Sequence, residues 1–282
     1  MFRFVLKLLV VFAIFTTAKT IERREYWLRF AYESNSSSVV LINDRFPGPM
    51  LEAVVNEILV IHVQNNLATH DELTVHFHGL FARKTPQMDG VAYVTQMPIR
   101  NGYNFTYVLP AYPSGTYFYH SHSGLQAITA FGALLIHEKE KVWNAVELPD
   151  GPLLFSDQWQ TSDRIVQENG LQNSPFKWMG EPTGLLINGK RNFSLIVESN
   201  RKYLVRLIGA TSLSTIVFGI DQHSMTVVEV DGTPVKPMSN LNSIEIMSGQ
   251  RYAVIIETRN LTVAAFLMKA EIRWRSMPNQ SQ

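Results

Sequence analysis

Short segments rich in Val, Ile, Tyr, Phe and Thr, separated by turn signals, constrain the fold of this chain most strongly. Examples are ILVIHVQNNL, KYLVRLIGA, SMTVVEVDGTPV and RYAVIIET. Residues of these types favour strands, and glycine-containing pairs such as Asp231-Gly232 and Ser248-Gly249 favour turns. Few long stretches have a helical period. The sequence therefore predicts an all-β fold.

Two pairs of segments resemble each other along the chain. LVIHVQN begins at Leu59 and is followed by RNGYNFTYVL, which contains Gly102. LVRLIGA begins at Leu204 and is followed, at nearly the same separation, by MSGQRYAVII, which contains Gly249. The similarity is low, but its regular spacing indicates an internal repeat. We therefore expect two copies of one β-sandwich.

The stretch HEKEKVWNAVELPDGP, residues 137–152, is charged and then contains Pro and Gly, unlike the strand-rich regions on either side. Composition of this kind is typical of a linker between domains. We place the boundary near Leu148, so that a first domain covers residues 19–147 and a second covers residues 148–282. A chain of 282 residues can form two domains of ordinary size, although the second can be incomplete.

The first 18 residues fit a signal peptide. Arg3 and Lys7 precede a short apolar run, and Thr16, Thr17 and Ala18 follow it. This run is too short to span a membrane comfortably, and no other apolar run is long enough. Five Asn-x-Ser/Thr sequons agree with secretion, and they begin at Asn35, Asn104, Asn192, Asn260 and Asn279. We therefore predict a secreted, glycosylated protein with residues 1–18 removed.

Charge and cysteine content narrow the range of functions. The net charge of +1 gives no indication of a nucleic-acid partner. The chain contains no cysteine, which is unusual for a secreted protein. This absence excludes disulfides, thiolate metal ligands and cysteine nucleophiles together.

Four histidines in two His-x-His pairs give the strongest indication of a functional site. His76 and His78 lie in LTVHFHGL, and His120 and His122 lie in GTYFYHSHSGLQ. Side chains alternate along a strand, so the members of each pair share a face, with Phe118 beside the second pair. Two such strands side by side would bring four imidazoles within reach of shared metal ions, and imidazole suits Cu, Zn, Fe and Ni.

A simpler interpretation treats paired histidines as surface residues, and a single pair would favour it. Here each pair ends an apolar strand and is followed closely by a glycine, Gly79 or Gly124, which would let backbone approach closely. We therefore favour a metal site. The sequence contexts of His62, His137 and His223 favour surface or structural roles, and we expect His223 to hydrogen-bond a turn.

The sequence HFHG at residues 76–79 is similar to the HxHG motif, and HSHSGLQ at residues 120–126 to the HxHSGLQ motif, of laccase-like multicopper oxidases of the animal type. RFPGP, MDGVAYVTQMPI, LLINGK, RLIGA and VVEVDGTPV also match. The resemblance covers roughly residues 40 to 258. It implies two tandem cupredoxin-like domains, which are Greek-key β-sandwiches.

This resemblance implies a role for each motif residue. The family reduces O₂ to water at a trinuclear copper cluster, one type 2 and two type 3 coppers, held by eight histidines. His76 would bind the type 2 copper, and His78, His120 and His122 would bind the type 3 pair. Asp89 matches an acidic residue thought to assist proton delivery. Because Asp-Gly is also a turn signal, a purely structural role for Asp89 stays open.

The sequence also departs from the family pattern. It contains neither HxxHxH nor HCHxxxH, the motifs of a third cupredoxin domain. A type 1 copper needs two histidines and a cysteine, so this chain cannot build that site. Met97 stands where a cysteine is frequent, and AITAFGALL after Gln126 replaces the usual Arg-x-Asp-Gly. We expect a third domain to be encoded beyond Gln282.

Three functions follow. The first is the N-terminal portion of a laccase-like oxidase, inactive alone, which when completed would use O₂ and a phenolic, diamine or metal-ion reductant. The second is a secreted pseudoenzyme that binds copper without turnover. The third is a glycosylated interaction module. The four histidines and Asp89 favour the first, and the sequence does not identify the reductant.

Overall fold

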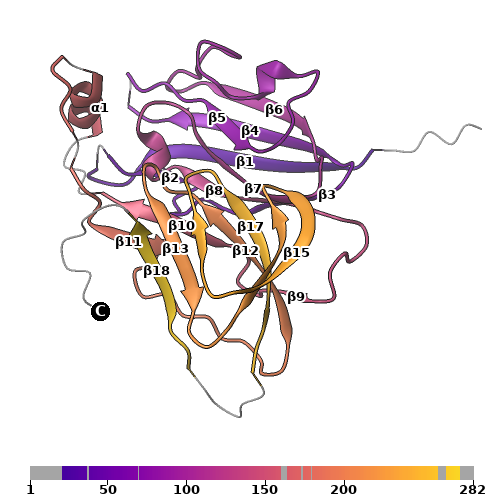
Figure 1. The fold of residues 1–282 in the computed structure, drawn as a ribbon. Helices are drawn as coiled ribbons and strands as arrows, with labels where there is room; N and C mark the ends of the chain where they lie inside the picture. The colour runs from indigo at the N-terminus through magenta and orange to yellow at the C-terminus, as the bar shows by residue number, and fades with distance from the viewer. Residues whose placement is uncertain are drawn as a thin grey trace, which may run out of the picture.

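The computed structural model describes residues 21–36, 38–68, 70–159, 164–172, 174–178, 180–259 and 265–273. The expected signal peptide, residues 1–18, lies outside these residues. The predicted all-β fold is confirmed, because strands dominate the described chain (Figure 1). No helix among the described residues is long and apolar enough to cross a bilayer.

The strands β1 to β8, residues 21–137 and here called the first half, form two four-stranded sheets. The orders are β2-β1-β4-β6 and β3-β8-β7-β5. The elements are β1 (Arg23–Tyr32), β2 (Val40–Ile42), β3 (Leu51–Val54), β4 (Ile58–Asn66), β5 (Val75–His78), β6 (Asn104–Pro110), β7 (Gly115–Ser121) and β8 (Phe131–His137), with the 3₁₀ helices η1 (Pro86–Met88) and η2 (Gln126–Ile128).

The strands β9 to β18, residues 138–273 and here called the second half, form a seven-stranded and a three-stranded sheet. The orders are β11-β10-β12-β17-β14-β15, with β9 also paired to β12, and β16-β13-β18. The elements are β9 (Val146–Glu147), β10 (Leu153–Gln158), α1 (Arg164–Gln172), β11 (Gly184–Ile187), β12 (Lys202–Gly209), β13 (Thr215–Ile220), β14 (Met225–Val230), β15 (Thr233–Leu241), β16 (Ile244–Ile246), β17 (Arg251–Glu257) and β18 (Met268–Arg273).

The internal repeat of the sequence reappears in the strand pairing. In the first half β4 pairs parallel with β1 and antiparallel with β6. In the second half β12 pairs parallel with β10 and antiparallel with β17. The repeated segments lie in β4 and β6 and in β12 and β17. Gly102 and Gly249 precede β6 and β17 with φ of 79° and 81°, a left-handed conformation that glycine adopts readily.

Each half has its own apolar core, which supports the proposed pair of domains. The boundary near Leu148 stays a proposal. Strand β9 precedes this boundary but pairs with β12 of the second half. Ala145 likewise packs with Leu204 in a small second-half cluster.

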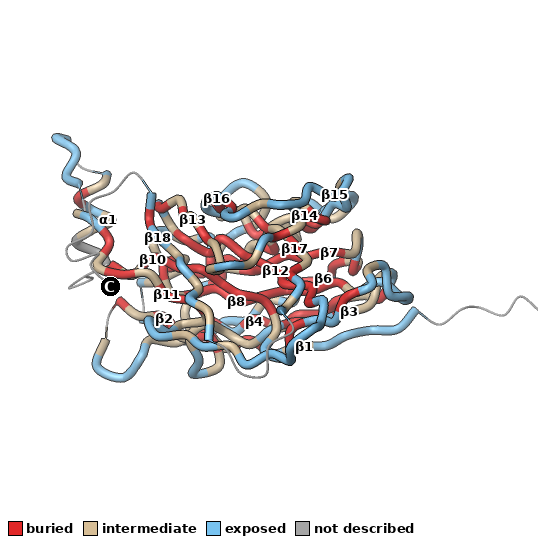
Figure 2. The backbone as a smooth tube through the Cα atoms, turned by 60° about the horizontal axis from the view of Figure 1, so that its bottom comes forward, coloured by how far each residue is buried: buried red, intermediate tan, exposed pale blue. Residues whose placement is uncertain are grey.

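The sheet β3-β8-β7-β5 lies between the two cores. Along β7, Tyr117 and Tyr119 point into the core of the first half. The intervening Phe118 packs on the opposite face with residues of both halves, in a cluster formed by Phe118, Phe131, Ala133, Leu154, Ile208 and Ala210. Buried backbone, red in Figure 2, runs through β8, β12 and β17. One face of this sheet therefore faces the second half.

Candidate metal centre

Strands β5 and β7 place His76, His78 and His120 on the face that turns toward the second half. The two strands pair antiparallel, with His76 opposite His120 and His78 opposite Phe118. Val75 and Phe77 alternate with the first pair and are buried in the first-half core. The predicted sharing of a face is confirmed for His76 and His78, and β5 and β7 are neighbours in a single sheet.

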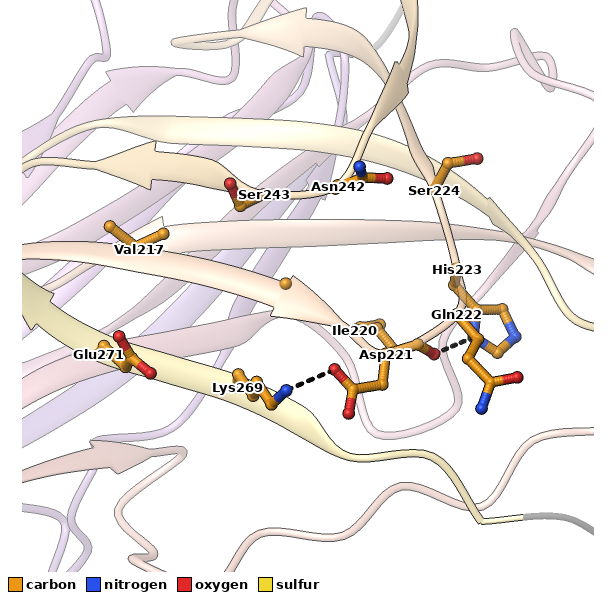
Figure 3. A pocket seen from close by; sticks show the side chains of 11 residues that line it. Val217, Ile220, Asp221, Gln222, His223, Ser224, Asn242, Ser243, Lys269 and Glu271 are labelled. Carbon is orange, nitrogen blue, oxygen red and sulfur yellow. Dashed lines mark hydrogen bonds and ion pairs between the residues drawn. The ribbon is translucent and has the colours of Figure 1, made fainter. Parts of the chain in front are cut away.

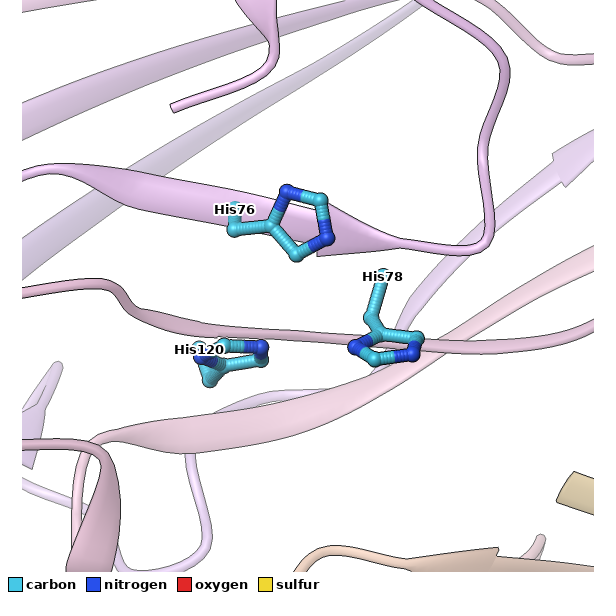
Figure 4. Close-up of side chains that lie close together, drawn as sticks. All are labelled: His76, His78 and His120. Carbon is cyan, nitrogen blue, oxygen red and sulfur yellow. The ribbon is translucent and has the colours of Figure 1, made fainter. Parts of the chain in front are cut away.

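Three of the four imidazoles form a compact group. One ring nitrogen from each of His76, His78 and His120 lies within 4.8 Å of the other two (Figure 4). His122 follows β7 and is exposed at the edge of this group. Its ring centroid lies 5.6 Å from that of His76 and 5.8 Å from that of His120. The structure thus brings all four candidate ligands together, with one at the rim.

Backbone carbonyls orient two of these rings. His76 Nδ1 lies 2.7 Å from the carbonyl oxygen of Asp89, and His120 Nδ1 lies 2.9 Å from that of Ser121. A carbonyl only accepts hydrogen bonds, so each Nδ1 carries the proton and each Nε2 keeps its lone pair. A hydrogen bond from the ring nitrogen that does not bind the metal fixes the tautomer of a metal-ligating histidine.

Burial keeps these imidazoles neutral. It lowers the pKa of His120 to about 3. Burial, reinforced by the Arg251 cation, lowers the pKa of His78 to about 4. The pKa of His76 is also lowered by burial, although hydrogen bonding and attraction by Asp89 oppose the shift. Because neutral imidazole is the form that binds metal, this donor set fits copper at neutral pH.

Asp89 lies in a turn and also faces the histidine group. It ends η1, and its backbone N–H donates to the carbonyl of Pro86 at 3.1 Å. Its carboxylate Oδ1 lies 3.5 Å from His76 Nδ1. The turn therefore presents a partly exposed carboxylate beside the histidine group. Whether that carboxylate delivers protons stays a proposal.

Side chains from the second half fill the space beside the two motif glycines. A Cβ at Gly79, where φ is 95°, would overlap the guanidinium of Arg251. A Cβ at Gly124 would overlap the carboxylate of Glu168, which accepts from the Leu125 N–H at 2.6 Å. We expected close approach by backbone at both glycines. That detail was wrong, because charged side chains from β17 and α1 approach instead.

A buried polar network, which sequence reasoning missed, joins the halves behind the histidines. Arg206 Nη1 donates to Thr116 Oγ1 at 2.8 Å and lies 3.4 Å from Glu229. Arg251 Nε donates to the Thr116 carbonyl at 3.1 Å. Arg206, Arg251 and Glu229 are all less than a tenth exposed. A signal was present, since RLIGA and QRYAVII each place an arginine in an apolar strand segment, where charges are rare unless paired.

His62, His137 and His223 have structural or surface surroundings, as predicted. His62 and His137 each contact an exposed glutamate, at 2.9 and 3.0 Å. His223 Nδ1 donates to the carbonyl of Asp221 across a turn at 2.9 Å, which confirms the expected bond (Figure 3). Asp221 also pairs with Lys269 at 2.8 Å.

Comparisons with known proteins show the family of this chain. Sequence models of the multicopper oxidase family match residues 27–141 and 150–282. An L-ascorbate oxidase from Brassica rapa subsp. pekinensis is 32% identical, over 96% of this chain and 53% of the relative. This chain belongs to the multicopper oxidase family.

Two solved structures extend the comparison. Fet3p, a multicopper oxidase that functions in iron import, has 26% identity and a TM-score of 0.81, over 89% of this chain and 49% of that chain. A laccase from Botrytis aclada has 29% identity and a TM-score of 0.75, over 86% and 48%. The halves are thus cupredoxin-like domains of this family. The chain spans about half the length of the curated relatives it matches.

Proposed function

We propose that this chain is the N-terminal, two-domain portion of a laccase-like oxidase and supplies half of the ligands of a trinuclear copper cluster. The observation that carries the proposal is the convergence of three ring nitrogens within 4.8 Å, with His122 beside them. By resemblance, His76 would hold the type 2 copper. His78, His120 and His122 would hold the type 3 pair.

The chain's own residues would prepare this site. Bound copper would supply the one-electron steps by which O₂ takes up four electrons and four protons to give two waters. The carbonyls of Asp89 and Ser121 hold the Nδ1 protons of two ligands, which leaves Nε2 for the metal. The Phe118 ring stacks on the His78 ring with 5.0 Å between the ring centroids and would shield that face of the imidazole from water. The Asp89 carboxylate, 3.5 Å from His76 Nδ1, would hold a proton at the edge of the histidine group.

Completion by further ligands and a type 1 site is part of this proposal. The sequence has no cysteine for a type 1 copper, so this chain alone is expected not to turn over. The completed protein would take electrons from a phenolic compound, a diamine or a metal ion. The lack of cysteine also favours a second candidate, a copper-binding pseudoenzyme. An interaction module is the third candidate.

Secretion and glycosylation are also part of this proposal. Three sequon asparagines lie in described regions, namely Asn35, Asn104 and Asn192, and all three are exposed. A glycan needs an accessible asparagine, so their exposure supports modification on the secretory route.

Copper titration of the whole chain tests the ligand assignment. Replacing His76, His78, His120 and His122 together by alanine should weaken Cu(II) affinity by more than about 100-fold. Loss of a group that only hydrogen-bonds to a metal ligand already lowers metal affinity by about 10- to 100-fold. The matched control replaces His62, His137 and His223 by alanine and should bind as the wild type does. Equal binding by both variants would reject the assignment.

Oxidase assays test the expected inactivity. The copper-loaded chain should consume no O₂ with phenolic or ferrous substrates above a copper-salt control. It should also show no intense blue thiolate-to-copper absorption. Turnover, or a blue band, would contradict the proposal that this chain needs a further domain.

A further inference from the structure

The ring of His78 is held differently from those of its neighbours. His76 and His120 each have a backbone carbonyl from the first half at Nδ1. Among the described residues, His78 makes no such hydrogen bond. It stacks on Phe118 with an angle of 23° between the rings. A Cβ on Gly249 of the second half would lie 2.8 Å from His78 Cε1 and 3.0 Å from Nε2. The backbone of Gly249 therefore borders the Nε2 edge of this ring.

Arg251 fixes the position of Gly249. Its Nη1 donates to the Gly249 carbonyl at 2.8 Å, and its Nε donates to the Thr116 carbonyl of β7 at 3.1 Å. One guanidinium thus bridges the turn before β17 and the strand that carries His120. The Gly249 N–H also donates to the Gly209 carbonyl at 2.8 Å. The turn is therefore tied both to its own half and to the histidine sheet.

We propose that Gly249 and Arg251 are positioning residues for His78, so that the second half builds one wall of the metal site carried by the first. The inference rests on the proposed function, in which His78 is a copper ligand. The Arg251 guanidinium occupies the space that a side chain at Gly79 would fill, and Gly79 directly follows His78 in the sequence. A lysine at position 251 would keep the charge but could not reach both carbonyls, because it lacks the planar fork.

The internal repeat supplies a matched control for Gly249. Gly102 occupies the equivalent turn with nearly the same φ, and a Cβ there would meet no atom within 4 Å. Gly102→Ala therefore carries the same backbone strain as Gly249→Ala without the contact to His78. Arg206 is the control for Arg251, because it is also buried and binds the side chain of the same Thr116.

Two measurements on the whole chain test the proposal. In the metal-free protein with isotope-labelled histidine, Gly249→Ala and Arg251→Lys should shift or broaden the His78 ring signals and leave those of His120 in place. In Cu(II) titrations the same variants should weaken affinity by about 10-fold or more, as removal of a ligand-orienting group does. Gly102→Ala and Arg206→Lys should leave both measurements close to wild type.

The outcomes separate this inference from the proposed function. If the wild type binds no copper, the proposed function fails, and the ring signals of the metal-free variants still decide whether Gly249 and Arg251 position His78. If the His78 signals and the copper affinity respond no more to Gly249→Ala and Arg251→Lys than to the controls, the inference is overturned. Urea unfolding of each variant shows that the comparison is made between folded proteins.

Discussion

The two halves have equivalent strand pairing, but the equivalent turn makes different contacts in each half. Gly102 and Gly249 precede β6 and β17 with nearly equal φ angles. In the first half the turn is open, and the next strand begins at the exposed Asn104. In the second half the turn borders His78, and the strand begins at the buried Arg251. The repeated pattern therefore determines the fold, whereas departures from it determine which half carries the histidine pairs and which half packs against them.

The halves also differ in how they carry charge at their contact. The first half presents imidazoles that burial keeps neutral. The second half contributes buried arginines, each with an acidic partner. Arg251 lies 3.2 Å from Asp231, and Arg206 lies 2.8 Å from Glu147. The acidic partners offset the cations, so the guanidinium groups can act as hydrogen-bond donors next to a site proposed to hold metal cations.

The largest stability effect is expected from removing Glu229. This buried carboxylate lies beside Arg206 and accepts the Thr116 N–H at 2.8 Å. Glu229→Leu would leave Arg206 with Glu147 as its acidic partner and would remove the acceptor of the Thr116 N–H. This change should reduce the free energy of unfolding by about 3 kcal/mol or more. Urea unfolding measures the loss. The control, Glu245→Leu, breaks the exposed pair with Arg273 and should cost at most about 1 kcal/mol.

Equal losses of unfolding free energy in the two leucine variants would contradict this prediction. The buried network between the halves would then contribute no more to stability than a surface pair. Because Glu229 accepts from β7, its loss should also separate the halves, and faster proteolysis near the linker would report that separation.

A smaller effect is expected where the backbones of the halves meet. A Cβ at Gly115, the first residue of β7, would lie 2.6 Å from the Cα of Gly232. Gly115→Ala forces the halves apart and should cost about 1–3 kcal/mol, the usual range for overpacking. Gly102→Ala adds a methyl group to open space and should cost less. If the urea midpoints of these two variants agree, the contact at Gly115 is looser than the structure indicates.

Much of the first half's contribution to the site could be predicted from sequence, because strand alternation is local. The two-residue period fixed which side His76 and His78 share, and the same rule applied to His120. Contacts of Gly249 and Arg251 could not be derived in this way. They join residues 135 or more positions apart and depend on how two sandwiches dock, which no local pattern encodes. Only the unusual arginines in apolar strands hinted at a buried partner.

The motif glycines illustrate the same limit. Their need for space was predictable from their position after each histidine pair. The identity of the neighbour was not, because Arg251 and Glu168 arrive from distant segments. The predicted internal repeat, in contrast, was confirmed by equivalent pairing of β4 with β6 and β12 with β17. Repeated hydrophobic patterns specify pairing, whereas close packing between domains depends on individual side chains.

The smallest effect is expected at Glu57, a first-half carboxylate that pairs with a residue of its own half. Its hydrogen bond with Arg24, 2.9 Å long, lowers the pKa of Glu57 below 4.5. A lowered carboxylate pKa stabilises the fold above pH 4.5 and ceases to do so as pH falls through the folded-state pKa. Glu57→Gln should therefore reduce the urea midpoint slightly at pH 7, and the difference from wild type should shrink below pH 4.5. A difference that persists unchanged in acid would exclude this origin.

The space that Gly79 leaves for Arg251 has a consequence for biosynthesis. Position 79 leaves the ribosome about 170 residues before position 251, which corresponds to roughly 10 to 30 s at usual elongation rates. During that interval β5 and β7 can pair, while Arg251 does not yet occupy the space beside Gly79. Arrested nascent chains ending before residue 249 should therefore expose His78 to chemical modification, and longer chains should protect it. The second half therefore closes one side of the His78 imidazole only after β5 and β7 have been synthesised.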